Sequence, residues 1–227
     1  MDVRGYAKRV ARILHTGDLG NPQIRREGLP LGNEGARWFV CTGSLIPSSV
    51  VYSFGVGQDI SFDLELIHRF GVRVHAFDPT PKSIEWLRTQ VLPTNFDFHP
   101  YGVADFEGTC KFFAPNNPAH VSHSIIERDT PWPAIGLPVH RLPTIMKMLG
   151  HERIDLLKMD IEGAEYAVIS DLLVCGLRVN QLLVEFHHRW KEIGRERTKR
   201  AVRDLNKAGF RIFSVSPGGE EYSLVRV

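Results

Sequence analysis

The stretch that decides the fold is Leu156–Glu165, LLKMDIEGAE, in which an apolar run ends abruptly at three acids grouped around a glycine. The leucines and the methionine suit a buried strand, whereas carboxylates are costly to bury without partners. The strand should therefore end at a solvated or ligand-filled crevice. In an open α/β sheet, ligands bind at these carboxyl ends of the strands.

On both sides of this stretch, apolar runs of strand length alternate with segments of helical spacing. We expect helices at 60–70, 81–91, 142–149, 164–174 and 195–208, and strands at 50–54, 72–77, 96–99, 154–159 and 181–186. Two further runs, 210–215 and 222–227, flank a Pro-Gly-Gly turn and predict a terminal hairpin. This order predicts an α/β fold with a mainly parallel sheet and one antiparallel edge strand.

The length of 227 residues and the hydrophobic content of 43% fit one domain with additions. Residues 1–36 read as an N-terminal arm or cap that includes a short amphipathic helix over 3–14, and 37–227 as the domain itself. Within the domain, 101–142 breaks the alternation of strands and helices. We expect an inserted hairpin and loop there, with a strand near 111–114.

Composition argues against several kinds of partner. The net charge of +2 does not suggest a protein that tracks nucleic-acid phosphates, and the basic run 195–203 fits a solvated helix face. Three scattered cysteines indicate neither a disulfide framework nor a zinc site. No apolar run approaches the length that a bilayer crossing needs. These features predict a soluble, cytoplasmic protein without membrane or nucleic-acid partners, and they leave the oligomeric state open.

The turn after the first strand, SFGVGQD at 53–59, contains two glycines that would let the backbone approach a ligand closely. Asp78 follows roughly 20 residues later at the end of the second strand, where an acid can bind both ribose hydroxyls. Alone, the glycines could form an ordinary turn. Together with Asp78 they favour a nucleoside cofactor. Ile60, at the third glycine position of the dinucleotide fingerprint, argues against a pyrophosphate site.

The stretch KMDIEGAE at 158–165 resembles the hallmark of the FkbM family of class I S-adenosylmethionine-dependent methyltransferases. The resemblance extends over about 50–186 and includes FDP at 77–79, YGVAD at 101–105 and VEFH at 184–187. It implies a three-layer Rossmann-like fold with a seven-stranded sheet, and S-adenosylmethionine as the cofactor.

By this resemblance, Gly55 and Gly57 approach the methionine part, Asp78 holds the ribose and 102–104 border the adenine. Many relatives have an acid at the position of Ser53, so Asp59 and Asp160 are candidates to bind the ammonium group. The implied cofactor-binding set is Ser53, Phe54, Gly55, Gly57, Asp59, Asp78, Pro79, Gly102, Val103, Ala104 and Asp160.

The resemblance also implies methyl transfer to a hydroxyl of a sugar or another small molecule. An alcohol is a poor nucleophile until a positioned base removes its proton. The candidates for catalysis are Asp160, Glu162 and His187, and those for contacts with the acceptor are Glu185, His123 and Ser124.

Other roles remain open for the same side chains. Asp160 could cap the following helix, and Glu165 is expected mainly to complement the helix dipole. Asp160, Glu185 and His187 could together bind a divalent metal. Two other functions also remain open for the whole chain, an NAD-dependent oxidoreductase and a non-catalytic nucleotide-binding module.

Overall fold

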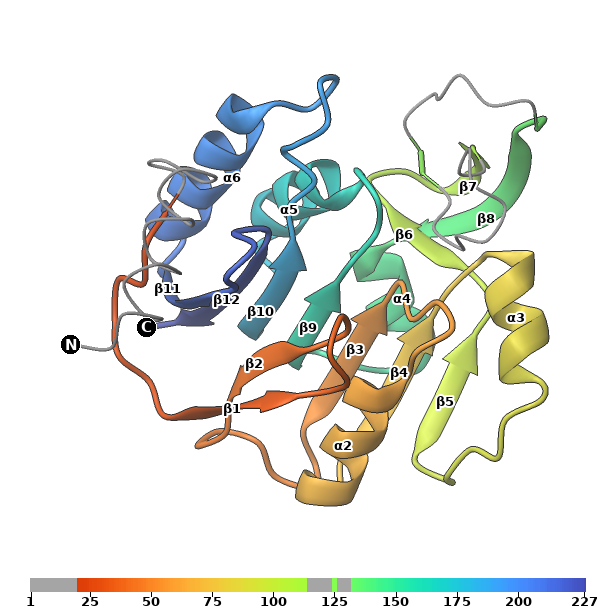
Figure 1. The fold of residues 1–227 in the computed structure, drawn as a ribbon, viewed down its shortest axis with the longest axis horizontal. Helices are drawn as coiled ribbons and strands as arrows, with labels where there is room; N and C mark the ends of the chain where they lie inside the picture. The colour runs from red at the N-terminus through yellow and green to blue at the C-terminus, as the bar shows by residue number, and fades with distance from the viewer. Residues whose placement is uncertain (1–19, 114–123, 126–131) are drawn as a thin grey trace.

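The computed structural model describes residues 20–113, 124–125 and 132–227, and its central feature is a seven-stranded sheet (Figure 1). The strands lie in the order β11, β12, β10, β9, β3, β4, β5. Their bounds are β3 Val50–Phe54, β4 Arg73–Phe77, β5 Phe96–His99, β9 Ile154–Met159, β10 Val179–Glu185, β11 Phe210–Val215 and β12 Glu221–Arg226. The predicted α/β class and mainly parallel sheet are confirmed.

One detail of the predicted sheet is wrong. The antiparallel strand is β12, and it lies between β10 and β11 instead of at the edge. Strand β11, which follows α6 (Arg195–Lys207), lies at the edge of the sheet. Its hairpin partner β12 lies between β11 and β10. The residues Tyr222, Ser223 and Leu224 of β12 are all buried. A strand that is buried on both faces suits an interior position.

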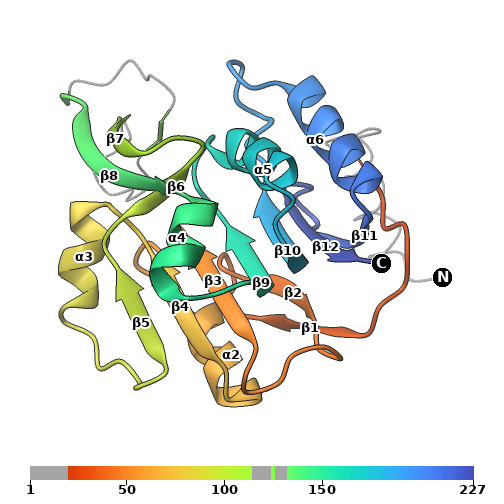
Figure 2. The ribbon, with the colours of Figure 1, turned by 180° about the vertical axis from the view of Figure 1, so that it is seen from behind.

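Helices cover both faces of the sheet, which makes three layers (Figures 1 and 2). On one face, α2 (Ser61–Phe70) and α3 (Pro81–Leu87) pack over a core that includes Val51, Leu66 and Leu156. On the other, α4 (Leu142–Leu149), α5 (Glu165–Val174) and α6 (Arg195–Lys207) pack over a core that includes Leu157 and Leu182. Successive residues of β9, such as Leu156 and Leu157, thus enter opposite cores, as the strand period of two requires.

A hairpin that the sequence did not predict lies across the first face. Strands β1 (Gly28–Leu31) and β2 (Trp38–Cys41) pair antiparallel, and Leu31, Trp38 and Val40 join the core over α2. The expected boundary between arm and domain at residue 36 falls in the turn of this hairpin. Just before it, the backbone N–H groups of Gln23 and Ile24 donate to the carbonyl of Ile212 in the edge strand β11. The arm therefore covers part of that edge.

A second, smaller sheet forms within the predicted insertion. Its strands, β6 (Gly102–Ala104), β8 (Ile135–Arg141) and β7 (Gly108–Phe112), lie side by side in this order. Figure 1 shows this sheet beyond the carboxyl ends of β9 and β3. Here β7 and β8 form the expected antiparallel pair, while β6 runs parallel to β8. The candidate helix over 3–14 lies outside the described residues.

None of the helices in the described ranges has the length and apolar composition that crossing a bilayer would require.

Candidate active site

A cavity of about 250 Å³ opens at the carboxyl ends of β3, β4 and β9, where the sequence predicted a ligand site. The glycine turn, Asp78, Asp160, Glu162 and Glu185 all line it, whereas His187 is not among the described residues that do. Gly102 and Val103 of the small sheet also border it. Ala104, the third residue predicted there, is buried in the core of the small sheet. One cavity therefore joins most of the predicted cofactor residues to Glu185, one of the predicted acceptor contacts.

The glycine turn brings two strand ends into close contact. Gly55 has φ 75°, and a Cβ atom on it would lie 1.7 Å from the backbone oxygen of Asp160. The backbone N–H of Asp160 in turn donates to the carbonyl of Phe54. Only glycine combines this backbone angle with such a close approach. The ring of Phe54 stacks on that of Phe77, with 4.2 Å between centroids, and so forms an apolar floor to the cavity.

Asp78 is buried, and three hydrogen bonds fix its carboxylate. The Gly57 N–H donates to Oδ2 at 2.9 Å, while the N–H and hydroxyl of Thr80 donate to Oδ1 at 2.9 and 2.6 Å. The hydroxyls of Thr80 and Ser83 are 2.7 Å apart. The neighbouring Pro79 also lines the cavity. Sequence reasoning found Asp78 but missed Thr80, although an aspartate followed two residues later by a threonine is a usual turn-forming pair.

Asp59 also lines the cavity, but its carboxylate is hydrogen-bonded to the first residue of α2. It accepts hydrogen bonds from the Ser61 N–H at 2.9 Å and from the Asn33 side chain at 3.3 Å. Partial burial acts against ionisation, but these hydrogen bonds hold the pKa of Asp59 below its usual value. Asp59 therefore has a local structural role besides any contact with a ligand.

A second buried carboxylate, Asp63, was not predicted as part of the site. Asp63 lines the cavity from the first turn of α2, and burial raises its pKa to about 6 against the opposing charge of Lys158. The fully buried Ser53 interacts with this carboxylate, and its side-chain hydrogen bond acts against the rise in pKa. A buried carboxylate in this position fits a ligand that supplies hydrogen-bond donors, such as an ammonium group.

Lys158 connects this region to the glycine turn, and it too was missed. Its Nζ donates to the carbonyl oxygens of Gly55 at 3.0 Å and Phe54 at 3.4 Å, and it lies 5.6 Å from the ring centroid of Trp38. A lysine inside an apolar strand was the available signal, because a buried cation requires partners.

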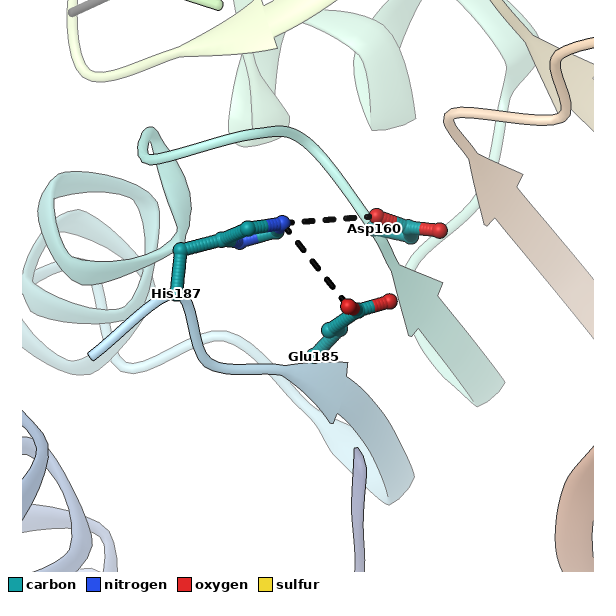
Figure 3. A group of neighbouring side chains, drawn as sticks. All are labelled: Asp160, Glu185 and His187. Carbon is teal, nitrogen blue, oxygen red and sulfur yellow. Dashed lines mark ion pairs between the residues drawn. The ribbon is translucent and has the colours of Figure 1, made fainter. Parts of the chain in front are cut away.

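Three side chains point toward one another at the ends of β9 and β10 (Figure 3). Asp160 follows β9 directly, Glu185 is the last residue of β10, and His187 lies two residues beyond it. His187 Nε2 lies 4.0 Å from Asp160 Oδ1, 3.9 Å from Glu185 Oε1 and 3.6 Å from Glu162 Oε2. The sequence predicted that Asp160, Glu185 and His187 would share this position at neighbouring strand ends. The fold brings them together and adds Glu162.

Glu165 fixes the orientation of His187. Glu165 Oε1 lies 3.1 Å from both the backbone nitrogen and the Nδ1 of His187, while Oε2 accepts the Gly163 N–H at 2.9 Å. The Glu165 side chain is fully buried. Sequence reasoning expected Glu165 to complement the helix dipole, and the structure shows that it also holds the imidazole.

The pKa values in this cluster depart from ordinary ones. Burial, followed by the charge of Asp160, raises the pKa of Glu185 to about 9. Burial would lower the pKa of His187, but the hydrogen bond and charge of Glu165, together with Glu162 and Glu185, raise it to about 9. Such strong coupling between carboxylates and an imidazole is typical of functional sites.

The turn between β9 and α5 has an unusual backbone. Glu162 has φ 51°, and among the described residues it is the one non-glycine residue with positive φ. Its carbonyl accepts a hydrogen bond from the buried Ser124 hydroxyl at 2.9 Å. Ser124, predicted to contact the acceptor, thus braces this turn. His123 lies outside the described residues. A strained residue held in this way is often part of a functional site.

Comparison with known proteins gives a family for most of this chain. Residues 49–212 match the family model described as the methyltransferase FkbM domain. This range contains the glycine turn, Asp78 and the whole cluster around His187.

Two curated relatives both carry the name "Probable methyltransferase-like protein 24". The protein of Rattus norvegicus is 27% identical over 179 residues, which make up 72% of this chain and 42% of that protein. The protein of Homo sapiens is 29% identical over 143 residues, 62% of this chain and 33% of that protein. The chain thus spans less than half the length of the curated relatives it matches.

Solved structures with a similar arrangement are more distant. The methyltransferase FkbM from Methylobacillus flagellatus has a TM-score of 0.48 and 15% identity, over 80% of this chain and 44% of that chain. Aeropyrum pernix fibrillarin, solved in complex with natively bound S-adenosyl-L-methionine, has a TM-score of 0.44 and 13% identity, over 91% of this chain and 85% of that chain.

Proposed function

Because the chain belongs to the FkbM methyltransferase family, we propose that it transfers a methyl group from S-adenosylmethionine to a hydroxyl of a small molecule. The observation that carries this proposal is the single cavity lined by both Asp78 and the carboxylates Asp160 and Glu185. A cofactor held at the first end would present its methyl group toward the second. Methyl transfer needs this arrangement, because the reacting atoms must be held in line at about 3 Å.

The residues of the cavity fit the parts of this cofactor. The oriented carboxylate of Asp78 suits the two ribose hydroxyls, and the backbone of Gly55 and Gly57 allows the methionine part to approach. Asp63 offers a buried carboxylate that lines the cavity to the ammonium group. Asp63 is thus a third candidate to bind the ammonium group, beside Asp59 and Asp160. It supplies an acid next to Ser53, which stands where many class I methyltransferases have an acid.

The reaction requires one proton transfer and one methyl transfer. The S–CH₃ bond breaks and its electron pair stays on sulfur, which leaves S-adenosylhomocysteine, while the acceptor oxygen forms the new O–CH₃ bond. The hydroxyl proton passes to the carboxylate cluster, in which Asp160 and Glu162 are the candidate bases. Glu185 also lines the cavity, and His187 Nε2 lies 3.9 Å from its carboxylate.

Membership in a methyltransferase family favours this function over that of an NAD-dependent oxidoreductase. Experiments can distinguish a methyltransferase from a non-catalytic nucleotide-binding module. Titration calorimetry should show saturable binding of S-adenosylmethionine, and Asp78→Ala should weaken it at least tenfold. A mass screen of sugars and other small alcohols should then find a product that has gained one methyl group. Absence of cofactor binding would refute the proposal, whereas binding without turnover of any acceptor would favour the non-catalytic module.

A further inference from the structure

We propose that Asp160, Glu185 and His187 form a binding site for one divalent metal ion at the acceptor end of the cavity. The role of this ion in methyl transfer rests on the proposed function, but the binding site itself does not. Each residue offers one ligand atom, and these three atoms all lie within 4.8 Å of one another. In Figure 3 the three side chains converge on one point from separate backbone positions.

The spacing of the ligand atoms suits a cation. Around an ion with bonds of about 2.1 Å, adjacent ligands lie roughly 3 Å apart and opposite ligands roughly 4.2 Å apart. The distances from His187 Nε2 to Asp160 Oδ1 and Glu185 Oε1 are 4.0 and 3.9 Å. They fall between these two limits. The ligand atoms of Asp160 and Glu185 lie within 4.8 Å of each other, so rotation of the two carboxylates would bring all three atoms to bonding distance from one ion.

The position of His187 supports a ligand at this point. Its side chain is only 8% exposed, and its Nε2 lies 3.6 to 4.0 Å from the carboxylates of Asp160, Glu162 and Glu185, just beyond hydrogen-bond distance from each. Meanwhile Nδ1 is held by Glu165, which is itself fixed by the Gly163 N–H. Histidines that bind metals generally have their second nitrogen held by a carboxylate or carbonyl in this way.

The charge around His187 also favours a cation. Four carboxylates, those of Asp160, Glu162, Glu165 and Glu185, lie within 4.0 Å of its two ring nitrogens. Acids placed this close together repel one another when ionised, and a divalent ion would offset that repulsion. Two carboxylate oxygens and one imidazole nitrogen are a donor set that Mn²⁺ accepts, and carboxylates also suit Mg²⁺.

Such an ion would assign separate roles to the acids. Three protein ligands leave open positions in an octahedral site, and the acceptor hydroxyl can occupy one of them. A bound cation lowers the pKa of an oxygen ligand. The released proton would pass to Glu162, the adjacent carboxylate that is not needed as a ligand. The acceptor oxygen would then take the methyl group from the cofactor, and the neutral methoxy product could leave an ion that is neither oxidised nor reduced.

The test uses Mn²⁺ as the probe and the intact chain treated with EDTA and then freed of chelator. Titration followed by electron paramagnetic resonance should show one bound Mn²⁺ per chain, displaced by Mg²⁺. Asp160→Asn, Glu185→Gln and His187→Gln should each weaken binding at least tenfold. Glu152→Gln and His68→Gln, which change exposed residues of the same types, should leave it unchanged. Failure of the unaltered chain to bind Mn²⁺ or Mg²⁺ at millimolar concentration would overturn the proposal.

Two further measurements keep the proposal separate from folding and from the proposed function. In crystals soaked in MnCl₂, an anomalous peak at bonding distance from the three side chains would support the site, and a peak elsewhere alone would overturn it. Calorimetry with S-adenosylmethionine in EDTA tests the cofactor alone. Cofactor binding without metal binding would refute only the metal site, and metal binding without cofactor binding would refute only the proposed function.

Discussion

The backbone of Gly55 lies so close to Asp160 that a Cβ atom at residue 55 would be 1.7 Å from the Asp160 carbonyl oxygen. This contact joins the glycine turn to the acid that follows β9, and both line the cavity. The close approach of these two strand ends depends on the absence of a side chain at residue 55.

The first prediction tests this contact. Gly55→Ala should lower the free energy of unfolding by about 3 kcal/mol or more, since a positive φ and a clash with backbone both add cost. Gly150→Ala is the matched control, because Gly150 has nearly the same φ, 73°, with nothing within 4 Å of the added Cβ. It should lose only about 1 to 2 kcal/mol. Urea denaturation measures both values, and equal losses would contradict the prediction.

The second prediction concerns the support of Asp78. Thr80→Val removes the hydroxyl that donates to Asp78 Oδ1 at 2.6 Å, and we expect roughly three- to tenfold weaker binding of S-adenosylmethionine, from the loss of one hydrogen bond. Asp78→Asn should cost more, about 10- to 100-fold, because it removes the charge itself. Calorimetry measures both affinities. Thr89→Val is the control, because the Thr89 hydroxyl donates to Trp86 outside the cavity. A larger loss for Thr80→Val than for Asp78→Asn would contradict this order.

The third prediction is a pH dependence due to Asp63. Burial raises its pKa from 3.8 to about 6 in the folded chain, so the folded state binds a proton more tightly than the unfolded state between these pH values. This contribution to stability is full below pH 3.8 and is lost as the pH rises through about 6. Asp63→Asn should therefore gain stability relative to the unaltered chain as pH rises, by up to about 3 kcal/mol near pH 7.

Urea denaturation at several pH values between 4 and 7, without cofactor, measures this difference. Asp204→Asn serves as a control of opposite sign, because the hydrogen bond from Lys207 holds the pKa of Asp204 below its usual value. Its stability relative to the unaltered chain should fall slightly as pH rises. A flat difference for Asp63→Asn would show that the carboxylate is solvated in the folded protein.

The fourth prediction concerns Glu165, which holds His187 without being a proposed metal ligand. Glu165→Gln should weaken Mn²⁺ binding about 10- to 100-fold, because the imidazole loses the anion that orients it. The exposed Glu196 provides the control, and Glu196→Gln should bind Mn²⁺ like the unaltered chain. Thermal denaturation in EDTA would separate an effect on folding from an effect on the site. Unchanged affinity in folded Glu165→Gln would show that Glu165 does not position His187 for the metal.

The sequence predicted the elements that position the site with little error. The strands at 50–54, 96–99 and 154–159 and the helix at 142–149 have the bounds that the structure shows. Each has a continuous apolar run or a clear helical period, and burial in the parallel sheet enforces that pattern. The β1–β2 hairpin was missed because its short strands depend on packing over α2, which no local pattern records.

The residues of the candidate site likewise include some that the sequence predicted and some that it did not. Asp78, Asp160, Glu185 and His187 could be predicted because each follows a recognisable strand, and parallel strands end at a common edge. Lys158 and Thr80 were missed although each had a local signal. Asp63 could not be placed, because a helical turn gives no sign of which neighbour a polar side chain will meet.

By itself, the sequence determined the α/β class, the family and the sheet edge at which the site lies, because these follow from local periodicity and a short hallmark. Only the tertiary structure decided that β12 lies inside the sheet, that Glu165 holds His187 and that Asp63 faces the cavity. The physical reason is that partners of buried polar groups are chosen by packing between distant segments. Those choices depend on three-dimensional distances that the order of residues does not contain.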